Sequence, residues 1–390
     1  MLDTNNDPSP SVLRAFDFPS RTRLVFGAGC VARVGEFARE TGAKRILLVT
    51  DAGIVAAGHA GRVQSSLEAA GLRVTLFDQA RENPTTKCVA ECVDAARAAG
   101  IDCIVGLGGG SSMDTAKGCN FILTNGGQMK DYWGVGKATK PMLPFIAIPT
   151  TAGTGSEMQS AALIADEITH QKMACLDPKC AARVAILDPT LTLSQPPRVT
   201  ACTGIDAIAH AVETAVTTKR NELSQKLSRE AFKLLVAGFP AVMAEPGNVF
   251  ARSQMQLGAA YAGGAIENSM LGAAHAAANP LTAHFGIAHG HAVGLMLPHV
   301  VRFNNKDEAA RELYAELARV GGIESTAESL AAFLAGALTL TNMPLNLSSA
   351  GVKRESLPML AEDAARQWTA GFNPRAIRAE DFLQLYSAAF

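Results

Sequence analysis

The sequence predicts a protein of two domains, a doubly wound, Rossmann-like α/β domain over residues 1–195 and an all-helical domain over residues 196–390. The 390 residues exceed the roughly 250–300 at which a single hydrophobic core stops growing. In the first half, short β-branched runs alternate with helical patterns, which is the rhythm of βαβ units. After Pro196 and Pro197 the strand pattern ends and Ala/Leu-rich segments of helical period follow, so we place the domain boundary at this pair.

Apolar runs in the first half are the candidate strands. Because they are apolar on both faces, they suit a parallel sheet that helices cover on both sides. The runs are Arg45–Thr50, Arg73–Phe77, Ile101–Gly106, Pro144–Pro149 and Arg183–Leu187. In the second half, the helical period is plain from Lys226 to Leu235, where apolar and charged residues line opposite faces.

Composition and charge exclude several classes of function. Apolar residues make up 48% and charged residues 18%, the balance of a compact globular protein, and the formal charge of -1 gives no electrostatic reason to bind nucleic acid. Met1–Asp7 is polar and acidic, unlike a secretory signal, and no apolar stretch reaches the roughly 20 residues that span a bilayer. The eight cysteines form no C-x-x-C pair. We therefore expect reduced, mostly buried cysteines in a cytoplasmic protein without membrane or nucleic-acid partners.

A glycine-rich stretch follows the third candidate strand and opens a predicted helix. It reads GLGGGSSMDTAK from Gly106 to Lys117. Clustered glycines let backbone amides approach a phosphate closely, and a helix N-terminus adds N–H groups and the positive end of its dipole. The stretch departs from G-x-G-x-x-G at Ser111, so an ordinary turn between strand and helix is the alternative.

A second polar stretch, PTTAGTGSE from Pro149 to Glu157, follows the next candidate strand. Its hydroxyls and amides lie at the carboxyl end of a strand, where α/β sheets bind ligands. Two such loops at the ends of different strands favour a shared dinucleotide site over two polar turns. Asp51, which ends the strand that begins at Arg45, can bind the adenosine ribose and repel a 2′-phosphate, which favours NAD over NADP. It can equally be the N-cap of a helix.

Histidines concentrate in the second half, where six of the eight lie between residues 210 and 299. Asp206 and His210 are four residues apart in GIDAIAHAVE, so both project from one helical face. With His275, among alanines, and a further histidine, they form a candidate site of one carboxylate and three imidazoles, which suits Fe²⁺ or Zn²⁺ and is poor for Mg²⁺ or Ca²⁺. Spacing alone does not choose among the competing histidines, which are His284, His289, His291 and His299.

Four motifs, in this order and spacing, make the chain resemble the iron-containing (group III) alcohol dehydrogenases over nearly its whole length. They are GGGSSMDTAK, PTTAGTGSE, GIDAIAHAVE and HGHAVGLMLPHV. The resemblance implies the fold that this family shares with dehydroquinate synthases, and hydride transfer between a small alcohol or aldehyde and NAD with a divalent metal. It also implies a homodimer or larger homo-oligomer. A polyol dehydrogenase of the glycerol type on the same fold, and a nucleotide-binding protein without catalysis, are the alternatives.

Position by position, the resemblance assigns Fe²⁺, with Zn²⁺ as second choice, to a set of ligands that also forms the catalytic centre. These are Asp206, His210, His275 and His289. It assigns cofactor contacts to Asp51, Asn83, Gly109, Gly110, Ser111, Asp114, Thr150, Thr151, Thr154 and Lys172.

Asn279 departs from the family pattern. Many members have a histidine four residues after the third ligand. This histidine lies near the nicotinamide and is given a proton-relay role. An amide donates and accepts hydrogen bonds but does not titrate near neutral pH. We therefore expect Asn279, as part of the catalytic centre, to orient substrate or nicotinamide while the proton leaves through water or a cofactor hydroxyl. The alternative is that Asn279 caps a helix whose first residue is Pro280.

Overall fold

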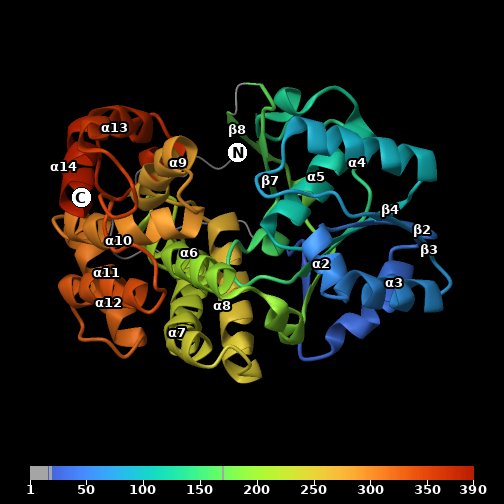
Figure 1. Ribbon diagram of the computed structural model, residues 1–390, viewed down its shortest axis with the longest axis horizontal. Coiled ribbons are helices and arrows are strands. Elements are labelled where there is room, and N and C mark those ends of the chain that lie inside the picture. Colours follow the sequence, from blue (N-terminus) through green and yellow to red (C-terminus); the bar gives the residue numbers. More distant parts are fainter. Residues whose placement is uncertain (1–15, 17–19, 169–170) are drawn as a thin grey trace. The chain divides into compact units, whose positions relative to one another are not determined.

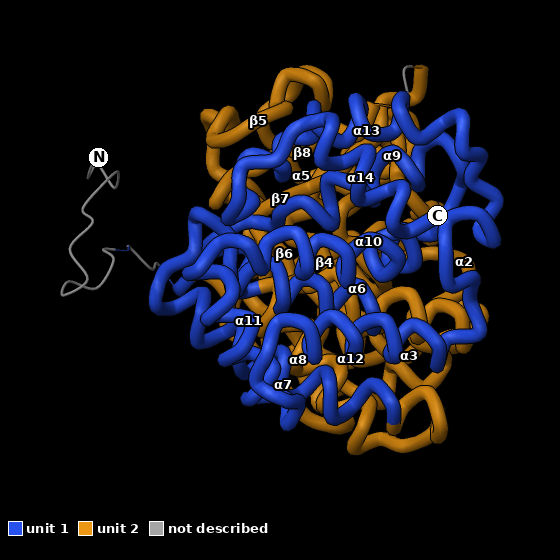
Figure 2. The backbone as a smooth tube through the Cα atoms, turned by 90° about the vertical axis from the view of Figure 1, so that its left-hand side faces the viewer, with its two compact units in different colours: residues 1–20, 204–240, 264–390 blue, residues 21–203, 241–263 orange. Residues whose placement is uncertain are grey.

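The computed structural model describes residue 16 and residues 20–168 and 171–390, so Met1–Asp7 lies outside the described residues. The chain forms two compact units, which Figure 2 distinguishes by colour. Unit 2 consists of residues 21–203 and 241–263, and unit 1 contains residues 204–240 and 264–390. The change from unit 2 to unit 1 falls within one continuous helix, α6 (Pro197–Val216). The domain boundary drawn at the double proline stays a prediction.

Unit 2 is built on a six-stranded parallel sheet in the order β1-β9-β6-β4-β2-β3. Figure 1 labels β2, β3 and β4 of this sheet. Its strands are β1 (Arg23–Phe26), β2 (Arg45–Val49), β3 (Arg73–Phe77), β4 (Cys103–Gly108), β6 (Phe145–Pro149) and β9 (Val184–Leu187). All the candidate strands are present. Sequence analysis missed β1, which has only four residues and lies at the edge of the sheet.

Helices pack on both faces of this sheet because both faces are apolar. They are α1 (Val34–Glu40), α2 (Ala52–Ala56), α3 (His59–Ala69), α4 (Thr86–Ala99) and α5 (Gly110–Asn125). Successive residues of β2 point to opposite faces, so Leu47 packs in the core under α4 and α5, and Ile46 packs in the core under α1 and α3. The strand order reverses between β2 and β4, and open α/β sheets bind ligands at such a point. The predicted doubly wound domain is confirmed.

A second, three-stranded sheet in unit 2 was not expected from the sequence. It consists of β5 (Gly134–Val135), β8 (Lys172–Leu176) and β7 (Ala161–Ala165), in that order. Strands β7 and β8 pair antiparallel, and β7 also packs against α5. The sequence does not predict this sheet because β5 has only two residues and β7 reads AALIA, a composition that equally suits a helix.

Unit 1 is helical, as predicted, and its described residues contain no strand. Three helices, α6, α7 (Glu222–Ala244) and α8 (Val249–Glu267), contribute residues to both units. The helices wholly within unit 1 are α9 (Ala273–Phe285), α10 (His289–Asn304), α11 (Glu308–Val320), α12 (Ala327–Thr339), α13 (Leu357–Ala365) and α14 (Ala379–Ala389). Helix α10 packs against α9 and α12, and α13 packs against α9 and α14.

Two further expectations concern the whole chain. Among the helices that the structure describes, none is long and apolar enough to cross a membrane. All eight cysteines lie in the described ranges, where none of them forms a disulfide and six are buried.

Candidate functional site

Three of the candidate cofactor regions follow neighbouring strands of the sheet. Asp51 follows β2, the glycine loop (Gly108–Ser112) follows β4, and the threonine loop (Pro149–Glu157) follows β6. In the β4–β6 ladder Gly108 lies opposite Pro149, and the Thr150 N–H donates to the Gly108 carbonyl at 2.9 Å. The parallel register therefore brings the two loops together at the carboxyl edge of the sheet.

The glycine loop opens α5 with a cap that has no side chain. Gly109 is the N-cap and Gly110 the first helical residue, so the first-turn N–H groups of this 16-residue helix can turn to an outside acceptor. A Cβ on Gly110 would lie 2.9 Å from Thr154 Cγ2, so any larger residue there would force the Thr154 side chain to shift. Ser111, Thr151 and Thr154 are half-buried beside this helix start. Such a cluster of amides and hydroxyls suits a pyrophosphate.

Lys117 anchors the threonine loop, a role that sequence analysis missed. Its side chain is buried, and Nζ donates to the carbonyls of Ser156, Gln159 and Ala161 at 2.7, 2.8 and 2.9 Å. Nζ also contacts Ser156 Oγ at 2.9 Å. The signal was present, because Lys117 comes seven residues after Gly110 and therefore lies on the same helical face.

Asp51 combines the two roles that the sequence left open. Its Oδ1 accepts from the Ile54 N–H at 3.0 Å, so Asp51 is the N-cap of α2. Its Oδ2 accepts from Ser112 Oγ at 3.3 Å, which joins Asp51 to the glycine loop. Capping therefore does not remove this carboxylate from the candidate nucleotide region.

Asp114, Lys172 and Asn83 are the candidate cofactor residues in other segments of unit 2. Burial raises the pKa of Asp114 to about 6, against the opposing effect of Lys117 and Lys172, and its carboxylate accepts from Ser156 Oγ at 3.3 Å. Lys172 is exposed at the start of β8. Asn83 has a left-handed backbone (φ 52°) just before α4 and lines a hollow of about 120 Å³. Among the described residues, no hydrogen bond joins it to the glycine loop or the threonine loop.

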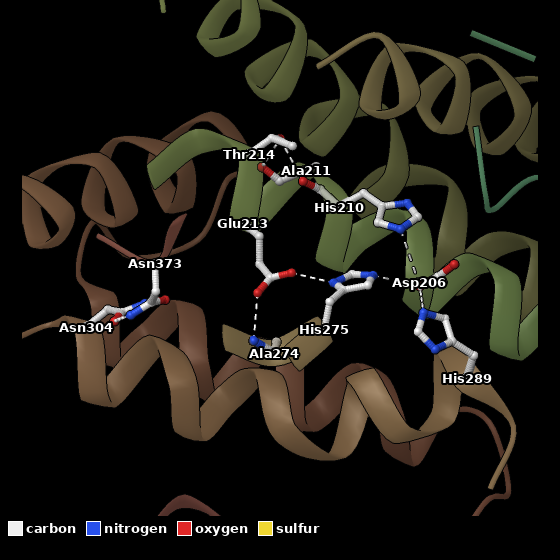
Figure 3. Close-up of polar contacts among 10 residues, drawn as sticks. All are labelled: Asp206, His210, Ala211, Glu213, Thr214, Ala274, His275, His289, Asn304 and Asn373. Atoms are coloured by element: carbon white, nitrogen blue, oxygen red, sulfur yellow. Dashed lines mark hydrogen bonds and ion pairs between the residues drawn. The ribbon is translucent and has the colours of Figure 1, made fainter. Parts of the chain in front are cut away.

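The four candidate metal ligands converge in unit 1 from three helices (Figure 3). Asp206 and His210 lie one turn apart on α6, His275 is the third residue of α9, and His289 is the first residue of α10. Asp206 Oδ1 lies 3.5 Å from His210 Nε2, 3.4 Å from His275 Nε2 and 3.8 Å from His289 Nε2. Ligands about 2.1 Å from one ion in a tetrahedral site lie about 3.4 Å apart. The ligand atoms of Asp206, His210 and His275 all lie within 4.8 Å of one another, so these three residues fit a shared ion, and His289 lies beside them near Asp206.

Burial and charge at this cluster also fit a cation. The side chains of Asp206 and His275 are 7% and 4% exposed, and neither Asp206 Oδ1 nor His275 Nε2 has a hydrogen-bond partner among the described residues. Burial opposes ionisation of Asp206, but His210, His275 and His289 hold its pKa below the usual range. Burial likewise lowers the pKa of His275, but Glu213 and Asp206 outweigh it and raise that pKa to about 9. A site that stabilises a protonated imidazole so strongly favours positive charge.

Two of the competing histidines, His284 and His291, are engaged elsewhere. His284 Nε2 lies 2.7 Å from Asp363 Oδ2, and His291 Nε2 lies 2.7 Å from the Pro344 carbonyl. The structure thus gathers the set that the family resemblance selects. Spacing could not have made this choice, because a helical pattern gives the face on which each histidine of α10 lies but not which helix packs against that face.

Two further residues of unit 1 concern this cluster. Glu213, which sequence analysis missed, accepts a hydrogen bond from His275 Nδ1. Its position seven residues after Asp206, on the same face of α6, was the available signal. Asn279 lies inside α9, which continues through Pro280 to Phe285, so the alternative that Asn279 caps a helix starting at Pro280 is wrong. Its Nδ2 donates to Gln367 Oε1 at 3.0 Å.

Comparison with known proteins gives matches along nearly the whole chain. The family model of the iron-containing alcohol dehydrogenases matches residues 21–189, and the model of that family's C-terminal part matches residues 200–390. The NAD-dependent methanol dehydrogenase of Bacillus methanolicus is 34% identical over 372 residues, which cover 94% of this chain and 97% of the relative. The lactaldehyde reductase of Escherichia coli K12 is 33% identical over 374 residues, with the same coverage of 94% and 97%.

A solved structure agrees with these matches. The crystal structure of a 1,3-propanediol oxidoreductase superimposes with a TM-score of 0.93 at 31% sequence identity, covering 97% of this chain and all of the other. A parallel α/β sheet followed by helices that gather one carboxylate and three imidazoles is the arrangement expected of a metal-dependent dehydrogenase. The chain belongs to the iron-containing alcohol dehydrogenase family.

Proposed function

We propose that this chain is a NAD-linked alcohol dehydrogenase and aldehyde reductase that uses a divalent metal. The proposed ligands are Asp206, His210, His275 and His289. The observation that carries the proposal is their convergence from three helices, with Asp206 Oδ1 between 3.4 and 3.8 Å from the three imidazoles. Relatives named as methanol dehydrogenase and lactaldehyde reductase support the reaction class.

Fe²⁺ is the proposed ion, ahead of Zn²⁺. Three imidazole nitrogens and one carboxylate oxygen suit either ion, and the family to which the chain belongs is named for iron. When bound, such an ion supplies Lewis-acid chemistry, which lowers the pKa of an alcohol and polarises a carbonyl. The protein holds the ligand atoms of Asp206 and His275 in a buried site, which limits competition by water for the metal.

The glycine and threonine loops are the proposed NAD site. Support comes from the amides at the start of α5, from the hydroxyls of Thr151 and Thr154, and from Lys117, which fixes the loop that carries them. Asp51 adds a negative charge next to Ser112. We propose that this charge meets the ribose 2′-hydroxyl and disfavours the 2′-phosphate of NADP. The remaining proposed cofactor contacts are Asn83, Gly109, Gly110, Ser111, Asp114, Thr150 and Lys172.

Asn279 is proposed to orient substrate or nicotinamide. It follows His275 by one helical turn, and its hydrogen bond to Gln367 uses Nδ2, which leaves Oδ1 to accept from a ligand. The test measures kcat against pH at saturating substrate. We expect Asn279→Ala to lose kcat at all pH values. We expect Asn279→His to show a new inflection near pH 6–7 as the imidazole titrates. Turnover near the wild-type value in Asn279→Ala would reject the orienting role.

A substrate panel tests the proposed function. Protein stripped of metal with a chelator is reconstituted with Fe²⁺ without oxygen, or with Zn²⁺, and assayed with short alcohols, short aldehydes and glycerol, using NAD(H) and NADP(H). We expect turnover of simple alcohols and aldehydes that depends on added metal. A clear preference for glycerol would establish the polyol dehydrogenase alternative, and NAD binding without any turnover would establish the non-catalytic one.

We also propose a cytoplasmic homodimer or larger homo-oligomer. The buried, unbridged cysteines among the described residues fit a reducing compartment. Sedimentation of the purified protein tests the assembly, and a monomer at micromolar concentration would contradict it.

A further inference from the structure

Glu213 makes two contacts with helix α9, although it belongs to α6 (Figure 3). Its Oε2 accepts from His275 Nδ1, and its Oε1 accepts from the Ala274 N–H at 2.7 Å. The residue is 3% exposed, so both contacts are shielded from water. One carboxylate thus holds a proposed metal ligand and the backbone next to it.

The contact with His275 selects the ring nitrogen that faces the cluster. An ionised carboxylate can only accept, so Nδ1 must be the protonated nitrogen when the imidazole is neutral. The lone pair is then on Nε2, which lies 3.4 Å from Asp206 Oδ1 in the cluster. Partners of this kind raise the basicity of a ligating histidine and fix the orientation of its ring.

The contact with Ala274 replaces a missing helix cap. Helix α9 begins at Ala273, and its N-cap is Gly272, which has no side chain to accept the first-turn N–H groups. Glu213 accepts one of them and places negative charge at the positive end of the helix dipole. A Cβ on Gly272 would lie 3.2 Å from Glu213 Oε1 and 3.4 Å from Asn373 Oδ1, so glycine leaves the room that the carboxylate occupies.

We propose that Glu213 is a positioning residue that registers α9 against α6 and so sets the affinity of the metal site. It follows His210 by three residues, so one face of α6 carries two proposed ligands and the group that fixes the third. This inference rests on the proposed function, because it requires His275 to be a ligand. Glu213 itself is not a ligand in it.

The test measures metal binding by full-length Glu213→Gln. A glutamine has one acceptor arm and one donor arm, so Glu213→Gln cannot accept from both His275 and Ala274. We expect the Kd for Co²⁺, titrated into metal-free protein against a chelator, to rise about 10–100-fold, and the visible absorption bands of bound Co²⁺ to change. The Kd for NAD should stay within about twofold.

Tyr386→Phe is the matched control. Tyr386 is also buried in unit 1, and its hydroxyl donates to the Ala277 carbonyl of α9 at 2.7 Å without contacting His275 or Glu213. Its removal should leave the Kd for Co²⁺ within about twofold. If Glu213→Gln does not fold, Gly272→Ala gives the second test, because its methyl group displaces the same carboxylate and should weaken Co²⁺ binding.

A double-mutant cycle separates positioning from general destabilisation. In a His275→Ala background, Glu213→Gln should change the Kd for Co²⁺ by less than about twofold, because the ligand through which Glu213 acts is gone. The same loss in both backgrounds, or wild-type affinity in Glu213→Gln, overturns the inference. If His275→Ala alone binds Co²⁺ as tightly as wild type, the proposed metal site fails instead, so the two failures are distinguishable.

Discussion

Two aspartates show how differently the two candidate sites are built. Asp114 lies beside the glycine loop in unit 2, and burial raises its pKa to about 6 despite the nearby lysines. Asp206 lies in the histidine cluster of unit 1, where the imidazoles outweigh burial and lower its pKa. At Asp114, burial outweighs the opposing effects of the lysines and of the Ser156 hydroxyl, so the carboxyl group is held toward its neutral form. At Asp206, three imidazoles outweigh burial, so the carboxylate is held in its ionised form, which is the form that binds a cation.

The sites also differ in what positions them. The loops are fixed mainly by backbone, through the β4–β6 ladder and the carbonyls that surround Lys117. The cluster is fixed by side chains from α6, α9 and α10, among them the carboxylate of Glu213. Substitutions that crowd the backbone should therefore damage NAD binding, and substitutions of single side chains should damage metal binding. Four predictions test this separation.

His275→Ala should have the largest effect. It removes a proposed ligand, so we expect metal affinity to fall by more than about 100-fold, beyond the loss from an outer partner, and turnover to fall to background. The Kd for NAD, measured by fluorescence titration, should remain within about twofold. Wild-type turnover in protein stripped of divalent ions would contradict the role of the metal.

Gly155→Ala should damage the loops instead. Gly155 has a φ of 61°, and a Cβ there would lie 2.5 Å from the Cα of Gly263. Strain and overpacking should cost about 2–4 kcal/mol of unfolding free energy, and NAD affinity should fall at least tenfold while the Kd for metal is retained. Urea unfolding and the two titrations measure these effects.

Gly336→Ala is the control for that variant. Gly336 lies in α12 with nothing within 4 Å of an added Cβ. It should raise the unfolding free energy by about 0.5–1 kcal/mol and alter neither ligand affinity. Equal metal and NAD losses in Gly155→Ala would show that the two sites are not positioned independently.

Asp51→Asn should alter cofactor choice with little effect on stability. Asparagine caps a helix about as well as aspartate, so α2 should keep its cap. Loss of one charge near the proposed 2′-position should reduce the NAD to NADP ratio of kcat/KM about tenfold, as expected for about 1.4 kcal/mol of charge interaction. Asp307→Asn, at the N-cap of α11, is the matched control. An unchanged ratio would remove Asp51 from cofactor selection.

Asp114→Asn should give the smallest effect, visible as a pH dependence. The folded chain holds the Asp114 proton to about pH 6, whereas the ordinary pKa is 3.8. The carboxyl group therefore lowers stability progressively as pH rises through this window. The Tm of Asp114→Asn minus the Tm of wild type should be larger at pH 7 than at pH 4. The same difference for Asp94→Asn, at an exposed position, should not change with pH. A Tm difference that is equal at both pH values would contradict the assignment.

Features that depend on neighbouring residues could be predicted from the amino-acid sequence. Alternating apolar runs and helical patterns gave the α/β sheet and the helical second half, because periodicity reports which faces are buried. Clustered glycines after a strand marked the loop at Gly110, and the four-residue spacing put Asp206 and His210 on one helical face. The motifs that resemble the family supplied the residues that spacing left open.

Tertiary structure decided whatever depends on contacts between distant segments. Only the packing of α6, α9 and α10 brought His289, and not His291, beside Asp206. Only the fold showed that Lys117 bonds to the threonine loop and that Glu213 caps α9. A sequence pattern gives the face of a helix on which a side chain lies, whereas its partner is set by the helix or loop that packs there, through contacts that no local period encodes.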